Sequence, residues 1–255
     1  MQFQVLSSGS KGNLTFIKTE QTSVLIDAGI SAKEIKLRSN IDLSKIDAIF
    51  ITHEHIDHVK YIEYIARLSD AVIYVNELSF KKMHKYFKDL SGLKVKYIGP
   101  NQTIKLKDLK IVSLNLQHDS ECCYGYIFVN NDKSIGYCTD TGYIPLPYIE
   151  LLKNVNSLII ESNHDIEMLM NSNRPFYLKQ RILSIKGHMS NKICGEVLNK
   201  LIKEGNIKNV VLAHLSEECN TEEVAIDTVL AQLESEMLPN FFVAKQWESL
   251  PLIEV

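Results

Sequence analysis

Short runs of alternating hydrophobic and polar residues, separated by glycines and polar turns, fill the first half of the chain and predict β-strands. The run 46–52 (IDAIFIT) is almost continuously apolar, as expected of a strand that is buried on both faces. Helical spacing predicts helices at 59–68 and 77–89, and the second of these is amphipathic and rich in lysine. Further strands are expected at 3–7, 14–18, 23–27, 72–75, 95–98, 103–106, 110–116, 124–129 and 134–139.

The second half of the chain alternates strands with helices. Strands are expected at 157–161, 208–213, 241–245 and 251–255, and helices at 176–185, 191–204 and 221–237. Two strand-rich halves with helices outside predict an α/β fold, a four-layer sandwich of two packed mixed sheets between helix layers. Periodicity alone leaves other α/β arrangements open. Because no repeat or linker-like stretch is visible, residues 1–255 are expected to form a single domain.

The composition excludes several classes of protein. Hydrophobic residues make up 45% of the 255 residues and charged residues 23%, so the chain is not mainly disordered. No apolar run approaches the roughly 18 residues that a membrane span requires. A net charge of −3 excludes a strongly basic nucleic-acid coat, although not a local basic patch. The N-terminus lacks a signal-peptide pattern and the five cysteines form no CxxC pair, so a cytoplasmic protein is expected.

The strongest chemical signal is the segment 52–58 (THEHIDH), which overlaps the end of the predicted buried strand. His53 and His55 alternate, so both can face one metal ion, while Asp57 and His58 can reach a second ion beside it. Imidazole nitrogens and carboxylates are the donors expected for Zn²⁺, Mn²⁺ or Fe²⁺. A surface loop is the weaker interpretation, because such a density of donors at the mouth of an apolar strand has no packing rationale.

Three more candidate ligands, His118, Asp140 and His214, each follow another predicted strand. Singly, each is equally well explained as a turn or capping residue. Because all three lie where a strand gives way to a loop, one end of the sheets can gather them. Together with the segment 52–58 they supply seven ligands, enough for two metal ions with positions open to water and substrate.

This constellation resembles the metallo-β-lactamase superfamily, whose HxHxDH signature is matched in full by 53–58. The stretches SSGSKGN and VLIDAG, and the order of the later ligands, are also similar. The resemblance implies an αβ/βα sandwich with two divalent metal ions. It implies that one ion is held by His53, His55 and His118, that the other is held by Asp57, His58 and His214, and that Asp140 bridges them.

Three further stretches are similar to the WalJ (YycJ) subfamily of bacterial metallohydrolases. These are IESNHD (160–165), LKQRILSIKGHMSN (178–191) and LAHLSEECNT (212–221). They are more specific than HxHxDH, which occurs across the superfamily. The subfamily is associated with 5′–3′ DNA exonuclease activity, so the resemblance implies a dinuclear-metal phosphodiesterase that acts on DNA.

The resemblance also implies roles for Glu161 and His188. In the related tRNA 3′-processing nucleases, a similarly placed Glu and a His in a GHST-like motif form a pair near the scissile phosphate. Carried over, His188 would contact the phosphate or protonate the leaving oxygen, and Glu161 would orient it. Asp57 would accept the proton of the bridging water. A solvent-exposed histidine and a surface acid are the plainer interpretations of these two residues.

Weaker candidates come from a small-residue turn and from one loop histidine. Amides and hydroxyls of the turn could touch phosphate oxygens, but a hairpin turn explains it equally well. His164 is either near the site or only orders its loop. The lysines at 81–88 are compatible with a nucleic-acid track but are more typical of a solvated face. The candidates in the turn are Ser8, Ser10, Lys11 and Asn13. Two adjacent cysteines, Cys122 and Cys123, are left without a role.

Two other functions stay open at this stage. The same metals in a tighter pocket suit a phosphodiesterase for small cyclic or nucleotide-derived esters, and a metal-binding regulatory module would bind ions without turnover. The short separation of Asp140 from His214 leaves no room for a large inserted clamp domain, which favours an open groove. The native metal, the digestion polarity and the oligomeric state are not determined by the sequence.

Overall fold

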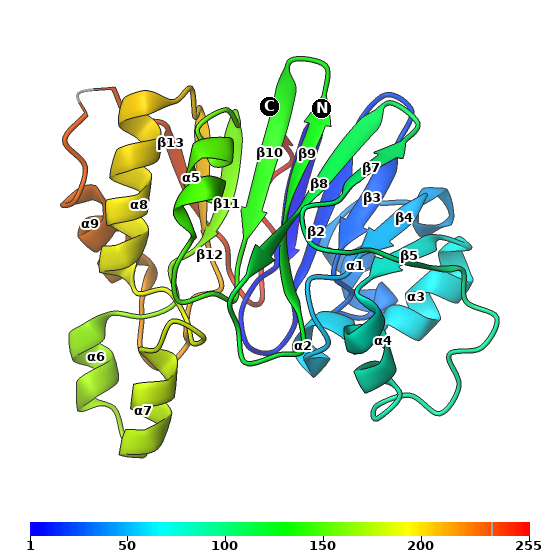
Figure 1. Ribbon diagram of the computed structural model, residues 1–255, viewed down its shortest axis with the longest axis horizontal. Helices are drawn as coiled ribbons and strands as arrows, with labels where there is room; N and C mark the ends of the chain where they lie inside the picture. The colour runs from blue at the N-terminus through cyan, green and yellow to red at the C-terminus, as the bar shows by residue number, and fades with distance from the viewer. Residues whose placement is uncertain (236) are drawn as a thin grey trace.

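The computed structural model describes residues 1–235 and 237–255, and its framework is a pair of seven-stranded sheets packed face to face (Figure 1). The first sheet contains, in spatial order, β14 (Ile253–Glu254), β1 (Gln2–Ser7), β2 (Leu14–Lys18), β3 (Ser23–Ile26), β4 (Ala48–Phe50), β5 (Val72–Val75) and β6 (Val95–Tyr97). The second contains β13 (Asn240–Val243), β12 (Asn209–Ala213), β11 (Ser157–Glu161), β10 (Lys133–Cys138), β9 (Cys123–Asn130), β8 (Leu109–Leu116) and β7 (Thr103–Leu106). Both sheets are mixed, as predicted.

Helices cover the outer faces of both sheets and complete the four layers (Figure 1). The first sheet carries α1 (Ala32–Arg38), α2 (Ile56–Val59), α3 (Ile62–Ser69) and α4 (Glu77–Met83), and the second carries α5 (Leu146–Leu152), α8 (Asn191–Glu204) and α9 (Glu222–Leu230). Two short helices, α6 (Ile166–Asn171) and α7 (Phe176–Ile182), lie below the second sheet in Figure 1. The four-layer α/β sandwich is therefore confirmed.

Three apolar clusters hold the layers together. Between the sheets, Phe50 packs edge-on against Tyr126 and Phe128, with ring centroids 5.6 Å apart in each case. A second cluster joins the outer face of the first sheet to its helices, and a third does the same for the second sheet. The strands buried on both faces are the ones whose sequences are continuously apolar.

Several predicted helix boundaries are wrong. The helix expected at 77–89 ends at Met83, although Phe87 and Leu90 beyond its end still pack on the apolar cluster of the first sheet. The helix expected at 59–68 begins later, as α3, and α2 precedes it with only Val59 inside the predicted range. The helix at 176–185 ends at Ile182. The helix expected at 221–237 ends at Leu230, and residue 236 of that prediction lies outside the described residues.

Three short helices, α1, α5 and α6, are absent from the sequence prediction. Their local signals are brief: Ser31 and Glu34 form a capping box at α1, and Asp165 caps α6. A 3₁₀ turn, Leu43–Lys45, is also absent from the sequence prediction. No helix among residues 1–235 and 237–255 is long and apolar enough to cross a membrane.

The strand directions bring the candidate ligands to one edge. Strands β10, β11 and β12 are parallel, and β8 runs the same way because two antiparallel pairings separate it from β10. Their carboxyl ends therefore meet at a single edge of the second sheet. A backbone hydrogen bond of 2.9 Å from Tyr124 to Thr52 joins that edge to the loop after β4.

Left-handed backbone marks three residues that follow strands, one in the first sheet and two in the second. Asp27, Asp140 and His214 have φ angles of 61°, 57° and 56°, and they follow β3, β10 and β12. Non-glycine residues adopt this region at some energetic cost, and aspartate and histidine are among the types that tolerate it best. Such strain gathers at functional sites, where it turns a side chain away from the strand direction.

Candidate metal centre

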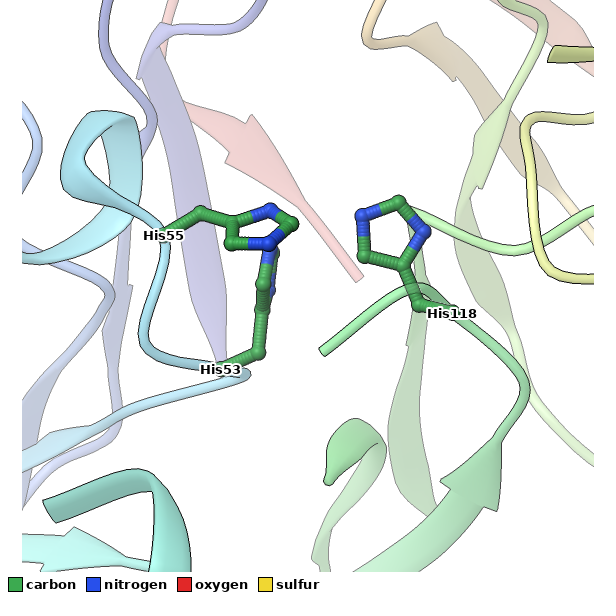
Figure 2. Close-up of side chains that lie close together, drawn as sticks. All are labelled: His53, His55 and His118. Carbon is green, nitrogen blue, oxygen red and sulfur yellow. The ribbon is translucent and has the colours of Figure 1, made fainter. Parts of the chain in front are cut away.

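A first group of histidines converges where the two sheets face each other. Figure 2 shows His53 and His55, from the loop after β4, turned toward His118, from the loop after β8. The ring centroid of His53 lies 4.4 Å from that of His55 and 5.0 Å from that of His118. One ring nitrogen of each histidine lies within 4.8 Å of the others. Three imidazoles at this spacing form a group that can hold a divalent cation.

A second group lies beside the first. Asp57, His58 and His214 also bring one ligand atom each within 4.8 Å of one another. The carboxylate of Asp140 lies 3.4 Å from Nε2 of His58, 3.5 Å from Nε2 of His214 and 3.9 Å from Nε2 of His118. Asp140 therefore touches members of both groups.

Four of the histidines are held at Nδ1, which leaves Nε2 to face the centre. Fixing the tautomer and the ring angle in this way is how proteins prepare histidine ligands. The partners of Nδ1 are Thr52 Oγ1 for His53 at 3.0 Å, Asp27 Oδ2 for His58 at 2.7 Å, the Gly187 carbonyl for His118 at 3.3 Å, and Glu161 Oε1 for His214 at 3.0 Å.

Buried polar atoms without partners point to the same conclusion. Nε2 of His53, Nε2 of His214 and Oδ2 of Asp140 are buried and have no hydrogen-bond partner among the described residues. A buried polar atom left unpaired costs about 1–3 kcal/mol, so three of them at one place are unusual in a folded protein. A cation would satisfy all three, and the donor set therefore fits divalent metal ions.

Electrostatic interactions keep the carboxylates of the centre charged. Burial raises the pKa of Asp57 and Asp140, but His58 and His214 outweigh it and hold both values below the ordinary range. Burial likewise lowers the pKa of His214, but Asp140, Asp57 and Glu161 raise it to about 10. For His53 burial dominates and the pKa lies well below the usual value. The ionised carboxylates give the centre the negative charge that suits a divalent cation.

One glycine allows three loops to interleave beneath the ligands. A Cβ on Gly29 would lie 1.8 Å from the carbonyl oxygen of Asp57 and 2.4 Å from the amide nitrogen of Asn13. The Gly29 amide donates to Asn13, and the Asn13 amide donates to Asp57, at 2.8 and 2.9 Å. Only glycine permits this approach, which fixes where Asp57 and His58 leave the loop.

The sequence reasoning assigned no role to Asp27, Glu54 or Asp119. Asp27 is buried against His58. In the sequence it could have been noticed as the acid that directly follows the apolar residues of VLIDAG. Asp119 lies 3.2 Å from Nε2 of His118. Glu54 faces away from the metal groups, so the acid inside the HEHIDH motif serves the fold.

The contacts of Glu54 show what that structural role is. Its carboxylate accepts a hydrogen bond from the Ser79 hydroxyl at 2.8 Å and one from the Glu121 amide at 2.9 Å. It thereby joins the loop of His53 and His55 to α4 and to the loop of His118. The three ligands of the first group are positioned partly through this one side chain.

Glu161 and His188 form the expected pair. Glu161 is completely buried, and its Oε1 lies 2.7 Å from Nδ1 of His188. Its Oε2 accepts hydrogen bonds from the amides of Thr141 and Met189. Burial raises the pKa of Glu161, but His188 and His214 lower it to below its ordinary range. The same Oε1 also contacts Nδ1 of His214, a double role that sequence reasoning did not include.

The turn between β1 and β2 contributes to the centre through Asn13. Its Nδ2 lies 3.3 Å from Oδ2 of Asp57 and 3.1 Å from Nε2 of His58. The hydroxyl of Ser8 accepts a hydrogen bond from the His214 amide at 2.8 Å. Lys11 pairs with Glu217 at 2.6 Å, and Ser10 is exposed.

His164 is buried and orders its loop. Its carbonyl accepts from the Asn191 amide at 2.9 Å, its Nδ1 lies 3.3 Å from Asn163 Oδ1, and its Nε2 has no partner among the described residues. Burial lowers the pKa of His164 to about 4. Among the described residues, Cys122 and Cys123 belong to none of the groups that could hold a metal, and burial raises the pKa of both thiols.

Two mixed sheets between helix layers, with groups of histidine and aspartate at one edge, define a metal-binding hydrolase of the αβ/βα sandwich class. The chain belongs to the β-lactamase superfamily, because residues 22–215 match the family model described as "Beta-lactamase superfamily domain". That superfamily is hydrolytic, and this protein is a metal-dependent hydrolase.

Relatives are similar over most of the chain. It is 32% identical to the exodeoxyribonuclease YycJ of Bacillus anthracis, over 92% of this chain and 89% of the relative. It is 35% identical to the exodeoxyribonuclease WalJ of Streptococcus pneumoniae, over 91% and 88%. These matches confirm the subfamily resemblance carried by the motifs of the second half of the chain.

Solved structures share the fold at low identity. The metallo-β-lactamase fold protein YhfI of Bacillus subtilis superposes with a TM-score of 0.72 at 19% identity, over 98% of this chain and 99% of that one. The short form of human tRNase Z superposes with a TM-score of 0.67 at 16% identity, over 98% and 99%. Both confirm the architecture.

Proposed function

We propose that this chain is a dinuclear-metal phosphodiesterase that removes nucleotides from DNA ends in the 5′–3′ direction. The observation that carries the phosphodiesterase chemistry is the Glu161–His188 pair beside the metal groups, since binding ions alone needs no such pair. The relatives at 32% and 35% identity are named as exodeoxyribonucleases, which supports DNA as the substrate. We further propose that residues 1–255 act as a single domain.

Two ions, Zn²⁺, Mn²⁺ or Fe²⁺, are assigned to the two groups. The first would be held by His53, His55 and His118, and the second by Asp57, His58 and His214, with Asp140 shared between them. The contacts of Asp140 with both groups, and the unpartnered atoms that face the centre, support this division. Divalent ions held there would lower the pKa of water and neutralise charge on the phosphate.

The remaining chemistry belongs to side chains. Asp57 is ionised and part of its carboxylate is exposed, so we assign it to accept the proton of the attacking water. Glu161 holds Nδ1 of His188, which leaves Nε2 for the substrate. We assign His188 to contact the phosphate and to donate a proton to the leaving oxygen. Asn13, whose amide reaches the centre, is assigned to the phosphate oxygens, and the assignment of Ser8, Ser10, Lys11 and His164 is weaker.

An assay with three substrates tests the proposal. Protein purified without added ions is analysed for metal and then given 5′-phosphorylated DNA, cyclic nucleotides and bis-p-nitrophenyl phosphate. Release of mononucleotides from the 5′ end of DNA is expected. Turnover of cyclic nucleotides without DNA degradation would favour the small-ester phosphodiesterase, and metal binding without any turnover would favour the binding module. The variant Asp140→Ala should lose most of its bound metal, and two ions retained in it would contradict the shared ligand.

A further inference from the structure

The segment 166–187, called the arm below, projects beyond the sheets next to the centre. It comprises α6 and α7 and lies between Glu161, at the end of β11, and His188 (Figure 1). Its buried apolar contacts are few, since Leu169 and Ile182 pack with Cys219 in a small separate cluster. Much of α7 therefore faces solvent.

Large apolar side chains are exposed on this arm. Phe176 and Tyr177 of α7 are 64% and 73% exposed, and Ile185, just after the helix, is 62% exposed. Leu183 is exposed as well. Single exposed hydrophobic residues are common on protein surfaces, whereas four within ten residues beside a functional site mark a binding surface.

The charge of the arm is mainly positive, and its one acidic residue is Glu167 of α6. Residues 172–187 include Arg174, Lys179, Arg181 and Lys186 and no aspartate or glutamate. The amine of Lys179 is buried against the carbonyls of Met170 and Ser172, and Arg174 pairs with Glu218. Arg181 keeps 59% of its side chain exposed although it reaches Asp119, and Lys186 makes no ion pair within the described part of the chain. Lys186 is therefore unpaired among the described residues, and Arg181 shares its charge with Asp119 but stays exposed enough to contact a ligand of negative charge.

The geometry connects this surface to the metal groups. Nη1 of Arg181 lies 3.3 Å from Oδ2 of Asp119, whose other oxygen lies 3.2 Å from Nε2 of His118. Tyr177 is four residues before Arg181 in α7, so the two share a face of the helix. The path from the centre outward therefore passes Arg181 first and Tyr177 one helical turn later.

We propose that the arm is a platform for unpaired nucleotides of the DNA strand that the centre degrades. Bases would stack on Phe176 and Tyr177, and phosphates would contact Arg181 and Lys186, the combination by which proteins hold single strands. A duplex hides the faces of its bases, so the platform selects single-stranded DNA. This inference rests on the proposed function.

The lysine-rich segment on the other side of the centre is less suited to this task. Two of its four lysines are engaged, since Lys81 pairs with Glu77 at 2.8 Å and Lys82 with Glu121 at 2.5 Å, whereas Lys85 and Lys88 make no ion pair within the described residues. The helix also ends at Met83, so the lysines at 81–88 do not share one helical face. We therefore place the strand on the arm.

Paired substitutions test the platform. The double variant Phe176→Ala/Tyr177→Ala should raise KM for single-stranded DNA by about tenfold or more, since each base stack is worth about 1–3 kcal/mol. Turnover of bis-p-nitrophenyl phosphate, which is too small to reach the arm, should stay within about twofold. Tyr177→Phe keeps the ring and should behave as the parent. Tyr64→Ala removes a 61% exposed tyrosine from α3 on the first sheet and serves as the matched control.

The outcomes separate the two proposals. A parent that degrades DNA, together with a double variant of unchanged KM for single strands, would overturn the platform and leave the proposed function standing. A parent that hydrolyses only bis-p-nitrophenyl phosphate would instead overturn the proposed function. If the double variant loses metal or does not fold, photo-crosslinking of a bromouracil oligonucleotide to the parent protein decides. Crosslinks to the arm support the platform, and crosslinks confined to other segments contradict it.

Discussion

The carboxylate of Asp27 lies 2.7 Å from Nδ1 of His58, and both side chains are completely buried. Asp27 also accepts hydrogen bonds from the amide and the hydroxyl of Thr52. Burial raises the pKa of Asp27, so its charge depends on these partners for compensation. The pair fixes the ring of His58 with Nε2 toward Asp57 and Asp140.

Asp27→Asn should weaken metal binding without unfolding the protein. The amide keeps the shape but removes the charge behind His58, and loss of such a partner typically reduces metal affinity by about 10–100-fold. Competition against a chelator of known affinity measures this effect. Asp108→Asn is the matched control, because Asp108 also accepts from two threonines, Thr19 and Thr22, but at a distance from the centre. Equal affinities of all three proteins would contradict the role of Asp27.

Removal of the metal ions should lower the thermal midpoint of unfolding. The candidate ligands come from four separate segments, so bound ions tie distant parts of the chain together and stabilise the native state by mass action. The unpartnered atoms of His53, His214 and Asp140 would then be buried without compensation. Thermal unfolding with and without chelator, with metal content measured, tests this. An unchanged midpoint after complete removal would show that the scaffold does not depend on the ions.

His188→Ala should retain both metal ions and lose turnover on DNA. A positioned general acid contributes about 10²–10⁴-fold to the rate, mostly where the leaving group is poor. Nitrophenolate leaves without much protonation, so the loss on bis-p-nitrophenyl phosphate should be smaller. The two rates and the metal content of the same preparation are compared. Full activity on DNA would remove His188 from the mechanism.

Glu161→Gln serves as the contrasting variant, because Glu161 contacts both His188 and His214. It should lose metal affinity as well as turnover, whereas His188→Ala should lose turnover alone. Identical metal affinity in Glu161→Gln and the parent would show that Glu161 acts only through His188.

Protonation of the buried His164 ring should lower the free energy of unfolding of the metal-free protein in acid. Its pKa is about 4 in the folded chain and about 6.5 when unfolded, so the unfolded state binds the extra proton first. The stability associated with the neutral ring is present above about pH 6.5 and decreases as the pH falls toward 4. Urea unfolding in chelator at several pH values should show a flatter dependence for His164→Gln than for the parent. Parallel curves would place the His164 pKa near its ordinary value.

Local patterns determined much of the fold and of the ligand set. The apolar run IDAIFIT forms the buried strand β4, and the donors that follow it lie at the end of that strand because neighbouring residues cannot separate. His118, Asp140 and His214 follow strands, as predicted, since a period of two and polar strand ends are properties of short segments. The amphipathic periods of the two halves indicated the order of strands and helices, although periodicity alone left other α/β arrangements open.

Only the tertiary structure decided which side chains form hydrogen bonds with the metal ligands and orient them. Asp27 and His58 are 31 residues apart and Glu161 and His214 are 53 apart, and no local pattern specifies which strand ends face each other. The early end of α4 was equally hidden, because the apolar period continues to Phe87 and Leu90, and both pack on the apolar cluster of the first sheet although the helix ends at Met83. Residue types and their periods are written along the chain, whereas hydrogen-bond partners and helix lengths depend on packing between distant segments.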